Sequence, residues 1–353
     1  MSFVYLITHV SNADSDSEST IVTESSPNNF RLTFFRLRLL ILGIFAFYNV
    51  GCATVPYRYG NFHTAKQEQP AEVEFEYGKP HKVLDGIAWT TGIWSRMLTM
   101  NRNVNNHDLS DESREKLINY MVENDLDDVL VRVNQYDPKG EWRRLRENHR
   151  VSAGWRYTFG LIAMAHYTFL PGRVFGGDEY NPFTNSLYIN SDVPAIALHE
   201  AAYAKDIHSR ALPGTYAFVN ELPLIGLWRH TLGVNDVLGY AQISDDWPVE
   251  RETYRVVYPR MGIYSVAISG SAIRFWDGII LTAAGAAAGH VTGQVALSQR
   301  ERERKLEDSP SDSVPEGTSE AESEEISSTT PEKGTSTDSI RFVKHESARR
   351  RDE

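Results

Sequence analysis

The side chains best placed for chemistry lie in one short stretch, from His199 to Asp206. If this stretch is helical, His199 and Tyr203 are one turn apart and Asp206 follows one turn later, so all three project from one face. Glu200 lies beside them, in the place that a general base would occupy. The spacing therefore predicts a reactive face on a single helix.

The flanking residues favour that helix. Asp192 can cap its start, Pro194 falls in the first turn where a missing N–H costs little, and alanines fill much of the rest. Upstream, residues 180–190 read as a turn and a short strand, because apolar Leu187 and Ile189 alternate with polar neighbours. We therefore expect a strand that leads into the reactive helix.

The sequence Leu-His199-Glu200-Ala-Ala-Tyr203 resembles the His-Glu-x-x-His helix of zinc metallopeptidases, the zincins, with Tyr203 in place of the second histidine. In that motif two imidazoles one turn apart bind zinc and the glutamate activates the metal-bound water. The resemblance covers about residues 175–240. It implies a zinc cofactor, a peptide substrate, His199 as a ligand and Glu200 as the catalytic base.

The tyrosine is the main departure from the motif. A phenol is a poor zinc ligand at neutral pH because it must lose a proton with a pKa of about 10, although zinc itself could lower that value. A third ligand is also open, and His230, Glu221 and Asp236 are the downstream candidates. His208 is a fourth, but helical geometry turns it away from the face of His199.

Two functional hypotheses follow. In the first, the chain is a degenerate relative of the zinc metallopeptidases, weakly active or inactive. If it is active, Glu200 activates water at an ion held by His199, Tyr203 and one of the downstream candidates. In the second, it is a non-catalytic envelope protein whose helices pack on partners or lipid and which has no metal site.

The N-terminal region suggests attachment to a membrane. Arg31, Arg36 and Arg38 precede an apolar run over residues 39–48, and small residues follow up to Cys52. This pattern resembles a bacterial lipoprotein signal, in which the cysteine carries the lipid. The run is short for a membrane span, which needs about twenty apolar residues, so an uncleaved anchor is the second interpretation. We expect a membrane-associated protein of the bacterial cell envelope.

Composition divides the chain further, and the fold class that we expect is α+β, mainly helical, with the motif helix next to a small sheet. The expected segments are a disordered extension (1–29), a signal or anchor segment (30–52), a tether (53–80), a zincin-like helical domain (81–273), an Ala/Gly-rich helix (274–298) and a disordered acidic tail (299–353).

Within the domain, periodicity predicts individual elements. Helices are expected over residues 82–100, 112–123, 141–149, 155–170 and 235–242, and a strand over 128–134. Residues 250–273 read as two pieces separated at Pro259, because proline ends most helices. In the helix of residues 155–170, we interpret His166 as a buried core histidine.

Residues 278–297 form a second apolar stretch, with Gly285, Gly289 and Gly293 at intervals of four. Small residues at this spacing let two helices approach closely, as in membrane proteins. A membrane span and a tightly packed core helix both fit this pattern.

Charge and cysteine content exclude several classes. The net charge is -11, but residues 307–338 alone hold ten acidic residues and one lysine, so the remainder is close to neutral. No basic patch with interleaved aromatics indicates nucleic-acid binding. A single cysteine excludes an intrachain disulfide. The sequence also lacks the glycine-rich phosphate and dinucleotide motifs and the Gly-x-Ser-x-Gly elbow.

Overall fold

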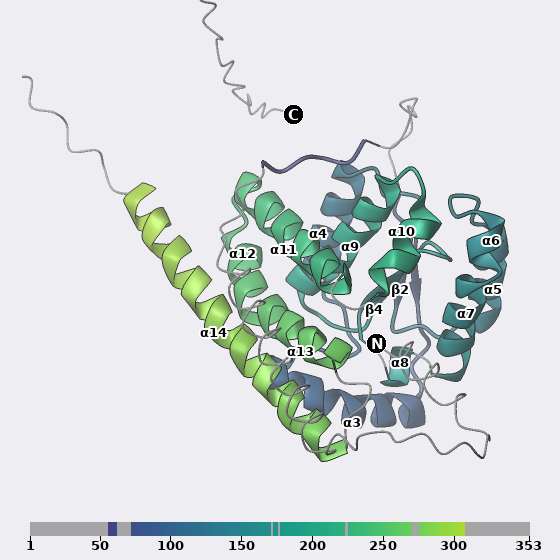
Figure 1. The fold of residues 1–353 in the computed structure, drawn as a ribbon, viewed down its shortest axis with the longest axis horizontal. Helices are drawn as coiled ribbons and strands as arrows, with labels where there is room; N and C mark the ends of the chain where they lie inside the picture. Colours follow the sequence, from purple (N-terminus) through teal and green to yellow (C-terminus); the bar gives the residue numbers. More distant parts are fainter. Residues whose placement is uncertain are drawn as a thin grey trace, which may run out of the picture. The chain divides into compact units, whose positions relative to one another are not determined.

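A computed structural model of the chain describes residues 56–61, 72–170, 172–175, 177–222, 225–269 and 275–307. Helices and a small four-stranded sheet make up this part (Figure 1). The prediction of a mainly helical α+β fold is therefore confirmed. The expected N-terminal extension, the signal segment with Cys52 and residues 308–353 of the expected tail lie outside the described residues.

The sheet is mixed, with strand order β1-β2-β4-β3. β1 (Phe75–Tyr77), β2 (Leu130–Val133) and β4 (Ser186–Ile189) are parallel, and β3 (Glu179–Asn181) pairs antiparallel with β4 at one edge. Every residue of β2 and β4 is buried, which explains their Val, Leu and Ile content. The strands expected near residues 128–134 and 186–190 are present.

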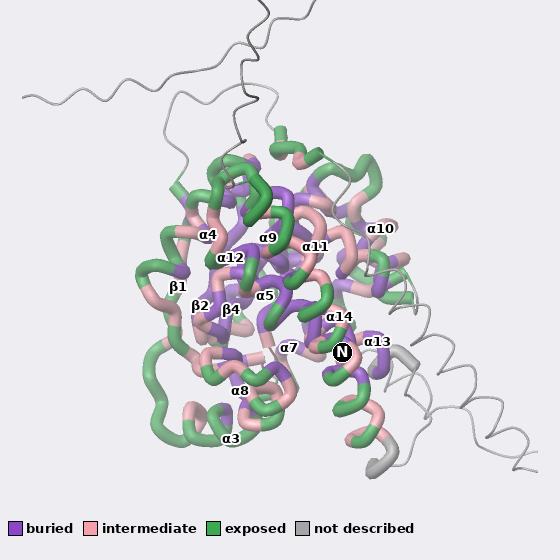
Figure 2. Tube along the Cα trace, turned by 90° about the vertical axis from the view of Figure 1, so that its left-hand side faces the viewer, coloured by how far each residue is buried: buried purple, intermediate pink, exposed green. Residues whose placement is uncertain are grey.

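Helices surround this sheet, and α9 lies in the core, in contact with α4 and α11 (Figures 1 and 2). Their bounds are α3 (Lys82–Thr99), α4 (Asp111–Glu123), α5 (Pro138–Glu147), α6 (Ala153–Arg156), α7 (Phe159–Phe169), α8 (Gly172–Phe175), α9 (Pro194–His208), α10 (Pro213–Asn220), α11 (Ile225–Ile243), α12 (Trp247–Glu252), a π-helical segment η1 (Thr253–Val257), α13 (Tyr258–Ser269) and α14 (Phe275–Glu307).

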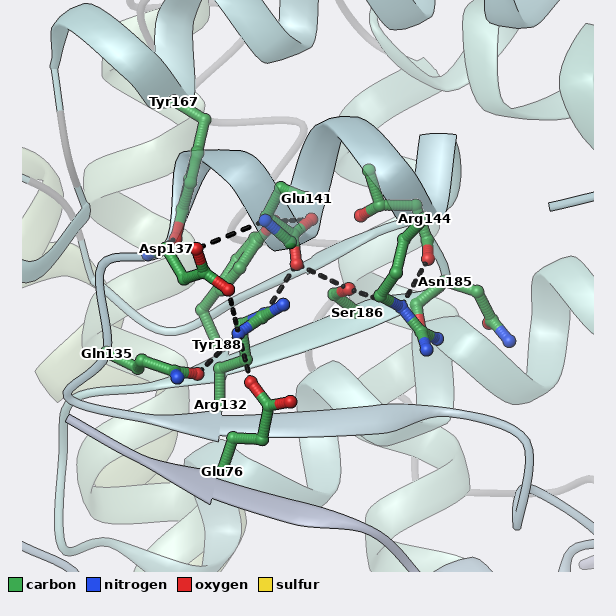
Figure 3. Close-up of polar contacts among 12 residues, drawn as sticks. Glu76, Arg132, Gln135, Asp137, Glu141, Arg144, Tyr167, Asn185, Ser186 and Tyr188 are labelled. Carbon is green, nitrogen blue, oxygen red and sulfur yellow. Dashed lines mark hydrogen bonds and ion pairs between the residues drawn. The ribbon is translucent and has the colours of Figure 1, made fainter. Parts of the chain in front are cut away.

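A buried polar cluster fixes α5 on one face of the sheet (Figure 3). Glu76, Arg132 and Tyr188 are cross-strand neighbours on β1, β2 and β4. Arg132 donates from Nε to Glu141 Oε1 at 2.5 Å and also pairs with Glu76. Glu141 accepts further hydrogen bonds from Ser186 (2.9 Å) and Tyr188 (2.6 Å). This cluster gives the buried charges of Arg132 and Glu141 partners and holds α5 in place.

Several expectations need correction. Residues 299–307, expected to belong to the disordered tail, form the last part of helix α14. The tether expected over residues 53–80 ends in β1, and Tyr57 is docked on the domain through a hydrogen bond from its hydroxyl to Asn124 Oδ1 (2.8 Å). The single helix expected over residues 155–170 is two, α6 and α7, because the chain leaves the helical path at Thr158 (φ -118°, ψ -87°).

The chain stays helical through Pro259, where we expected a break. α12, η1 and α13 follow one another without a gap. A prolyl ring lacks an N–H and crowds the carbonyl of the residue four positions back, here Arg255. Arg255 lies in the π-helical segment, whose wider turn accommodates the proline.

α14 packs lengthwise against α13 and η1. Three of its glycines make this approach possible, since a methyl group on any of the three would collide with a backbone carbonyl oxygen: Gly285 with Gly262, Gly289 with Tyr258, and Gly293 with Tyr254. The predicted close helix contact is confirmed. Among the described residues, the segment Gly278–Glu307 is long and apolar enough to cross a membrane.

Candidate functional site

The motif helix α9 is almost entirely buried, and His199 and Glu200 are 4% and 3% exposed. Pro194 occupies its first turn as expected, but Asp192 does not cap it. The first turn instead donates from Ala195 N to Glu252 Oε2 at 3.0 Å, so a carboxylate from α12 faces the positive end of the helix dipole. The motif therefore lies on a rigid element in the core.

α11 crosses α9 at His199, and a glycine makes the crossing possible. A methyl group on Gly233 would lie 3.0 Å from both Cδ2 and Nε2 of the His199 ring, a contact too close for a well-packed core. The backbone of α11 therefore rests directly on the imidazole. We did not predict a role for Gly233, although a glycine inside an apolar helix often marks such an approach.

His199 and His230 form part of a stack of three rings. The His230 ring lies between His199, at a centroid distance of 5.3 Å and 8° between planes, and Tyr264, at 4.4 Å and 14°. His199 Nδ1 lies 3.2 Å from Glu200 Oε1, and its Nε2 lies 3.3 Å from the backbone oxygen of His230. Both ring nitrogens of His199 thus face oxygens of the protein.

Arg229 contacts two of the predicted ligands, His230 and Tyr203. Its Nη2 atom is 3.2 Å from His230 Nε2, and its guanidinium carbon is 4.2 Å from the centroid of the Tyr203 ring. Burial lowers the pKa of His230 well below the usual histidine value, and the charge of Arg229 lowers it further. His230 is therefore a neutral imidazole beside a permanent cation.

A second arginine, Arg260, also lies close enough to Glu200 to affect its pKa. Arg260 donates from Nη1 to Asp178 Oδ2 (3.1 Å) and from Nη2 to the Tyr264 hydroxyl (2.9 Å). Burial opposes ionisation of Glu200, but its hydrogen bond with His199 and the charges of Arg260 and Arg229 outweigh burial and lower the pKa of Glu200. A carboxylate held ionised in this way is a weaker base than one with a pKa near 7.

These groups line a cleft of about 320 Å³. Its lining includes Glu200, Arg229, His230, Arg260 and Tyr264, together with Asp178 just before the edge strand β3 and Glu179 at its start. Residues of α3, α7 and α8 complete the lining of the cleft. One of them is His166, which we expected to be buried in the core but which is half-buried at the cleft. The volume lies at the lower end of the range for small-molecule sites.

The other predicted ligands are less close to this arrangement. Glu221 lies at the exposed margin of the cleft. Asp236 binds Lys205 Nζ at 2.6 Å and accepts from the Tyr120 hydroxyl, and it does not line the cleft. His208 points to Asn185 and Tyr180, as helical geometry predicted.

The sequence pattern placed Asp206 on the same helix face as His199 and Tyr203. Its carboxylate accepts a hydrogen bond from the Tyr216 hydroxyl at 2.6 Å and pairs with Arg210. It takes no part in the cleft. The structure therefore brings together His199, Glu200, Tyr203 and His230, with Glu221 at the margin of the same cleft and Asp236 and Asp206 bound elsewhere.

The described residues do not fit a zinc site. In that part of the chain no group of three or more His, Cys, Asp or Glu side chains is arranged to hold a metal ion. The local reason is the Arg229 guanidinium, which contacts His230 Nε2 and repels a cation. Burial raises the pKa of the Tyr203 phenol to about 12, which further disfavours a phenolate ligand.

We compared the chain with models of known protein families, with curated proteins and with solved structures, and none of them matches it.

Proposed function

We propose that this chain is a membrane-attached protein of the bacterial cell envelope, related to the zinc metallopeptidases, whose cleft no longer performs metal-dependent peptide hydrolysis. The observation that carries the proposal is the position of Arg229. Its guanidinium contacts both His230 and Tyr203, the two side chains that would complete a zinc site with His199. A permanent cation here replaces the charge that a metal ion would supply.

The arrangement around the cleft supports the relationship. An antiparallel edge strand, β3, pairs with β4, and β4 leads into the helix that carries the motif. Asp178 and Glu179 at the start of β3 line the cleft. This order resembles the arrangement in the zincins, in which an edge strand borders the substrate cleft. The next long helix, α11, brings His230 against His199.

Attachment to a membrane has two supports. The first is the sequence around Cys52, which resembles a lipoprotein signal. The second is α14, of which the segment Gly278–Glu307 has the length and composition of a span. Globomycin, which inhibits removal of lipoprotein signals, should cause an unprocessed form to accumulate, and Cys52→Ala should release the protein from the membrane fraction. Full membrane retention of Cys52→Ala with no effect of globomycin would assign attachment to the apolar segments.

The zinc content of the full-length protein tests the relationship. The parent and Tyr203→His should carry no zinc, because Arg229 persists in both. The double variant Tyr203→His with Arg229→Gln restores the second histidine and removes the cation, so it should take up zinc. Adding His199→Ala to that double variant should abolish the uptake.

Near-stoichiometric zinc in the parent, lost on His199→Ala, would contradict the proposal that the site has lapsed. Failure of the folded double variant to bind zinc would contradict the relationship itself. Peptide hydrolysis, measured with internally quenched peptides, should be absent from the parent at any added zinc concentration.

A specific observation favours the alternative function, a non-catalytic interaction protein. Large apolar side chains are exposed near one end of the cleft, among them Trp89 on α3, Phe169 on α7 and Phe175 on α8, at 57%, 79% and 61%. Figure 2 shows much of α3 exposed. An apolar surface of this kind commonly binds a partner or lipid. Loss of a co-purifying partner or of liposome binding in a Trp89→Ser, Phe175→Ser variant would support this function.

A further inference from the structure

Arg229 differs in its partners from the arginines of the domain that are paired with carboxylates. Arg132, Arg173 and Arg260 each form an ion pair with a carboxylate. Arg229 contacts His230 Nε2 and the Tyr203 ring, and within the described residues no carboxylate comes within ion-pair distance of it. The charges of Glu221 and Glu200 favour the cationic form of Arg229, but neither carboxylate is in contact with it, so the guanidinium keeps donors for an anion from outside the chain.

Polar atoms next to Arg229 also lack partners. Both side-chain amide atoms of Asn220, the Tyr203 hydroxyl and His230 Nδ1 are buried and form no hydrogen bond of normal geometry. These three residues are 3%, 4% and 6% exposed. The Tyr203 hydroxyl is close enough to Arg229 and Asn220 for both to affect its pKa, but not aligned with either. Buried polar groups are nearly always hydrogen-bonded, so this cluster indicates a polar ligand.

Asn220, Arg229 and His230 all line the cleft. A ligand that enters the cleft would therefore meet a guanidinium and an amide N–H₂, both of which are hydrogen-bond donors. A planar carboxylate matches the fork of an arginine and can accept from an amide at the same time.

The rest of the cleft limits the ligand further. Four acidic side chains line it, namely Asp178, Glu179, Glu200 and Glu221, and they would repel a multiply charged phosphate more strongly than a single carboxylate. Apolar side chains complete the lining, namely Val104, Leu170, Val174, Phe175, Leu222 and Ile263. The space suits a small ligand with one carboxylate and an apolar body.

We propose that the cleft binds an organic monocarboxylate, with the carboxylate at Arg229 and Asn220 and the apolar body along the Phe175 and Ile263 side. The inference rests on the proposed function in one respect, since it requires that the cleft holds no metal ion. Two sources provide this chemistry, the C-terminus of a peptide and a free fatty acid. In the first case the protein binds the C-terminus of a peptide without hydrolysing the peptide.

Isothermal titration calorimetry on the full-length protein in detergent tests the proposal. The probes are N-acetyl-Ala-Leu and hexanoate, and each is compared with its own amide, which lacks the charge. At least one carboxylate should bind saturably, and its amide should bind at least about tenfold more weakly. Binding of the peptide alone assigns the peptide source, and binding of hexanoate alone assigns the fatty acid.

Variants locate the site. Arg229→Gln should weaken carboxylate binding about tenfold or more, and Arg229→Lys should retain part of the affinity because it keeps the charge. Asn220→Asp preserves shape but adds a negative charge, so it should abolish binding. Arg255→Gln, an exposed arginine of η1, is the matched control and should bind as the parent does.

Several outcomes would overturn the proposal. They are absence of binding for both carboxylates, equal affinity for carboxylate and amide, and unchanged affinity in folded Arg229→Gln and Asn220→Asp variants. Thermal unfolding of each variant establishes folding, and the amide comparison needs no variant. Zinc is measured in the same samples: no carboxylate binding and no zinc removes this inference alone, whereas stoichiometric zinc removes the proposed function as well.

Discussion

Arg300 of α14 donates from Nε to the Oε1 atom of Glu250 in α12, 2.9 Å away. Glu250 is completely buried, and it also accepts from Gln242 Nε2 of α11 at 3.0 Å. Closer to the start of α14, the ring nitrogen Nε2 of His290 lies 2.9 Å from the backbone oxygen of Leu98. The last long helix is thus joined to the domain by polar contacts as well as by its glycines.

Glu250→Gln should therefore lower the free energy of unfolding by about 2 kcal/mol, because it removes a buried charge partner of Arg300. Urea denaturation followed by circular dichroism measures the change. Arg304→Gln is the control, since Asp245, its partner at 3.2 Å, is 82% exposed, and it should cost less than about 1 kcal/mol. Equal losses in the two variants would contradict the importance of the buried pair.

Gly289→Ala should separate α13 from α14. A methyl group there meets the carbonyl oxygen of Tyr258, and overpacking of this kind costs about 1–3 kcal/mol. Gly278→Ala, in the same helix but with no neighbouring atom within 4 Å, should be neutral or stabilise by up to about 1 kcal/mol. Thermal unfolding distinguishes them, and a stable Gly289→Ala variant would disprove the close approach.

Glu141→Gln tests the buried cluster on the sheet. The variant leaves Arg132, which is 1% exposed, without its innermost carboxylate, and we expect a loss of about 3 kcal/mol in the free energy of unfolding. Arg150→Gln breaks a pair with Asp128 whose side chains are 30% and 38% exposed and should cost less than about 1 kcal/mol. A loss for Glu141→Gln no larger than that for Arg150→Gln would contradict a stabilising role of the cluster.

Glu252 should make stability depend on pH. Burial raises its pKa to about 7, against an ordinary value of 4.5, although the hydrogen bond from Ala195 N opposes the rise. Between these pH values the folded protein binds a proton that the unfolded chain has released. Stability therefore falls as the pH rises from about 4.5 to 7, and the loss is complete above 7.

Glu252→Gln keeps an acceptor for Ala195 N and removes the titration. It should be more stable than the parent at pH 8, by on the order of 2 kcal/mol, and equal to it at pH 4.5. Denaturation at both pH values measures this difference. The same substitution at exposed Glu115 should give no gain at pH 8, and a gain of the same size there would point to net charge as the cause.

Local signals predicted the helices and strands best. Ser110 begins α4 as expected, because its side chain accepts from Ser113 N at 3.3 Å. Asp192 shows the limit of such reasoning. It was expected to cap α9, but its carboxylate accepts from the hydroxyls of Ser110 (2.7 Å) and Ser113 (2.5 Å) on another helix. A short polar side chain near a helix start can serve a neighbouring helix instead of its own.

The site was predictable only in part for a similar reason. His199, Glu200 and Tyr203 lie within one turn of a single helix, so their spacing shows that they share a face. Arg229 and Arg260 come from α11 and α13, and no local pattern places them beside Glu200. Their role depends on how the helices cross, and Gly233, which sets one crossing, carries no side chain that suggests chemistry.

The docking of Tyr57 limits how far the domain could stand from a lipid on Cys52. The tyrosine ring packs on Tyr240 at a centroid distance of 5.6 Å, and its hydroxyl is bound to Asn124. Five residues of extended chain reach about 17 Å at most. A lipid on Cys52 would therefore hold Tyr57 within that distance of the attachment point. The side of the domain formed by α4 and the end of α11 would stay close to the bilayer surface.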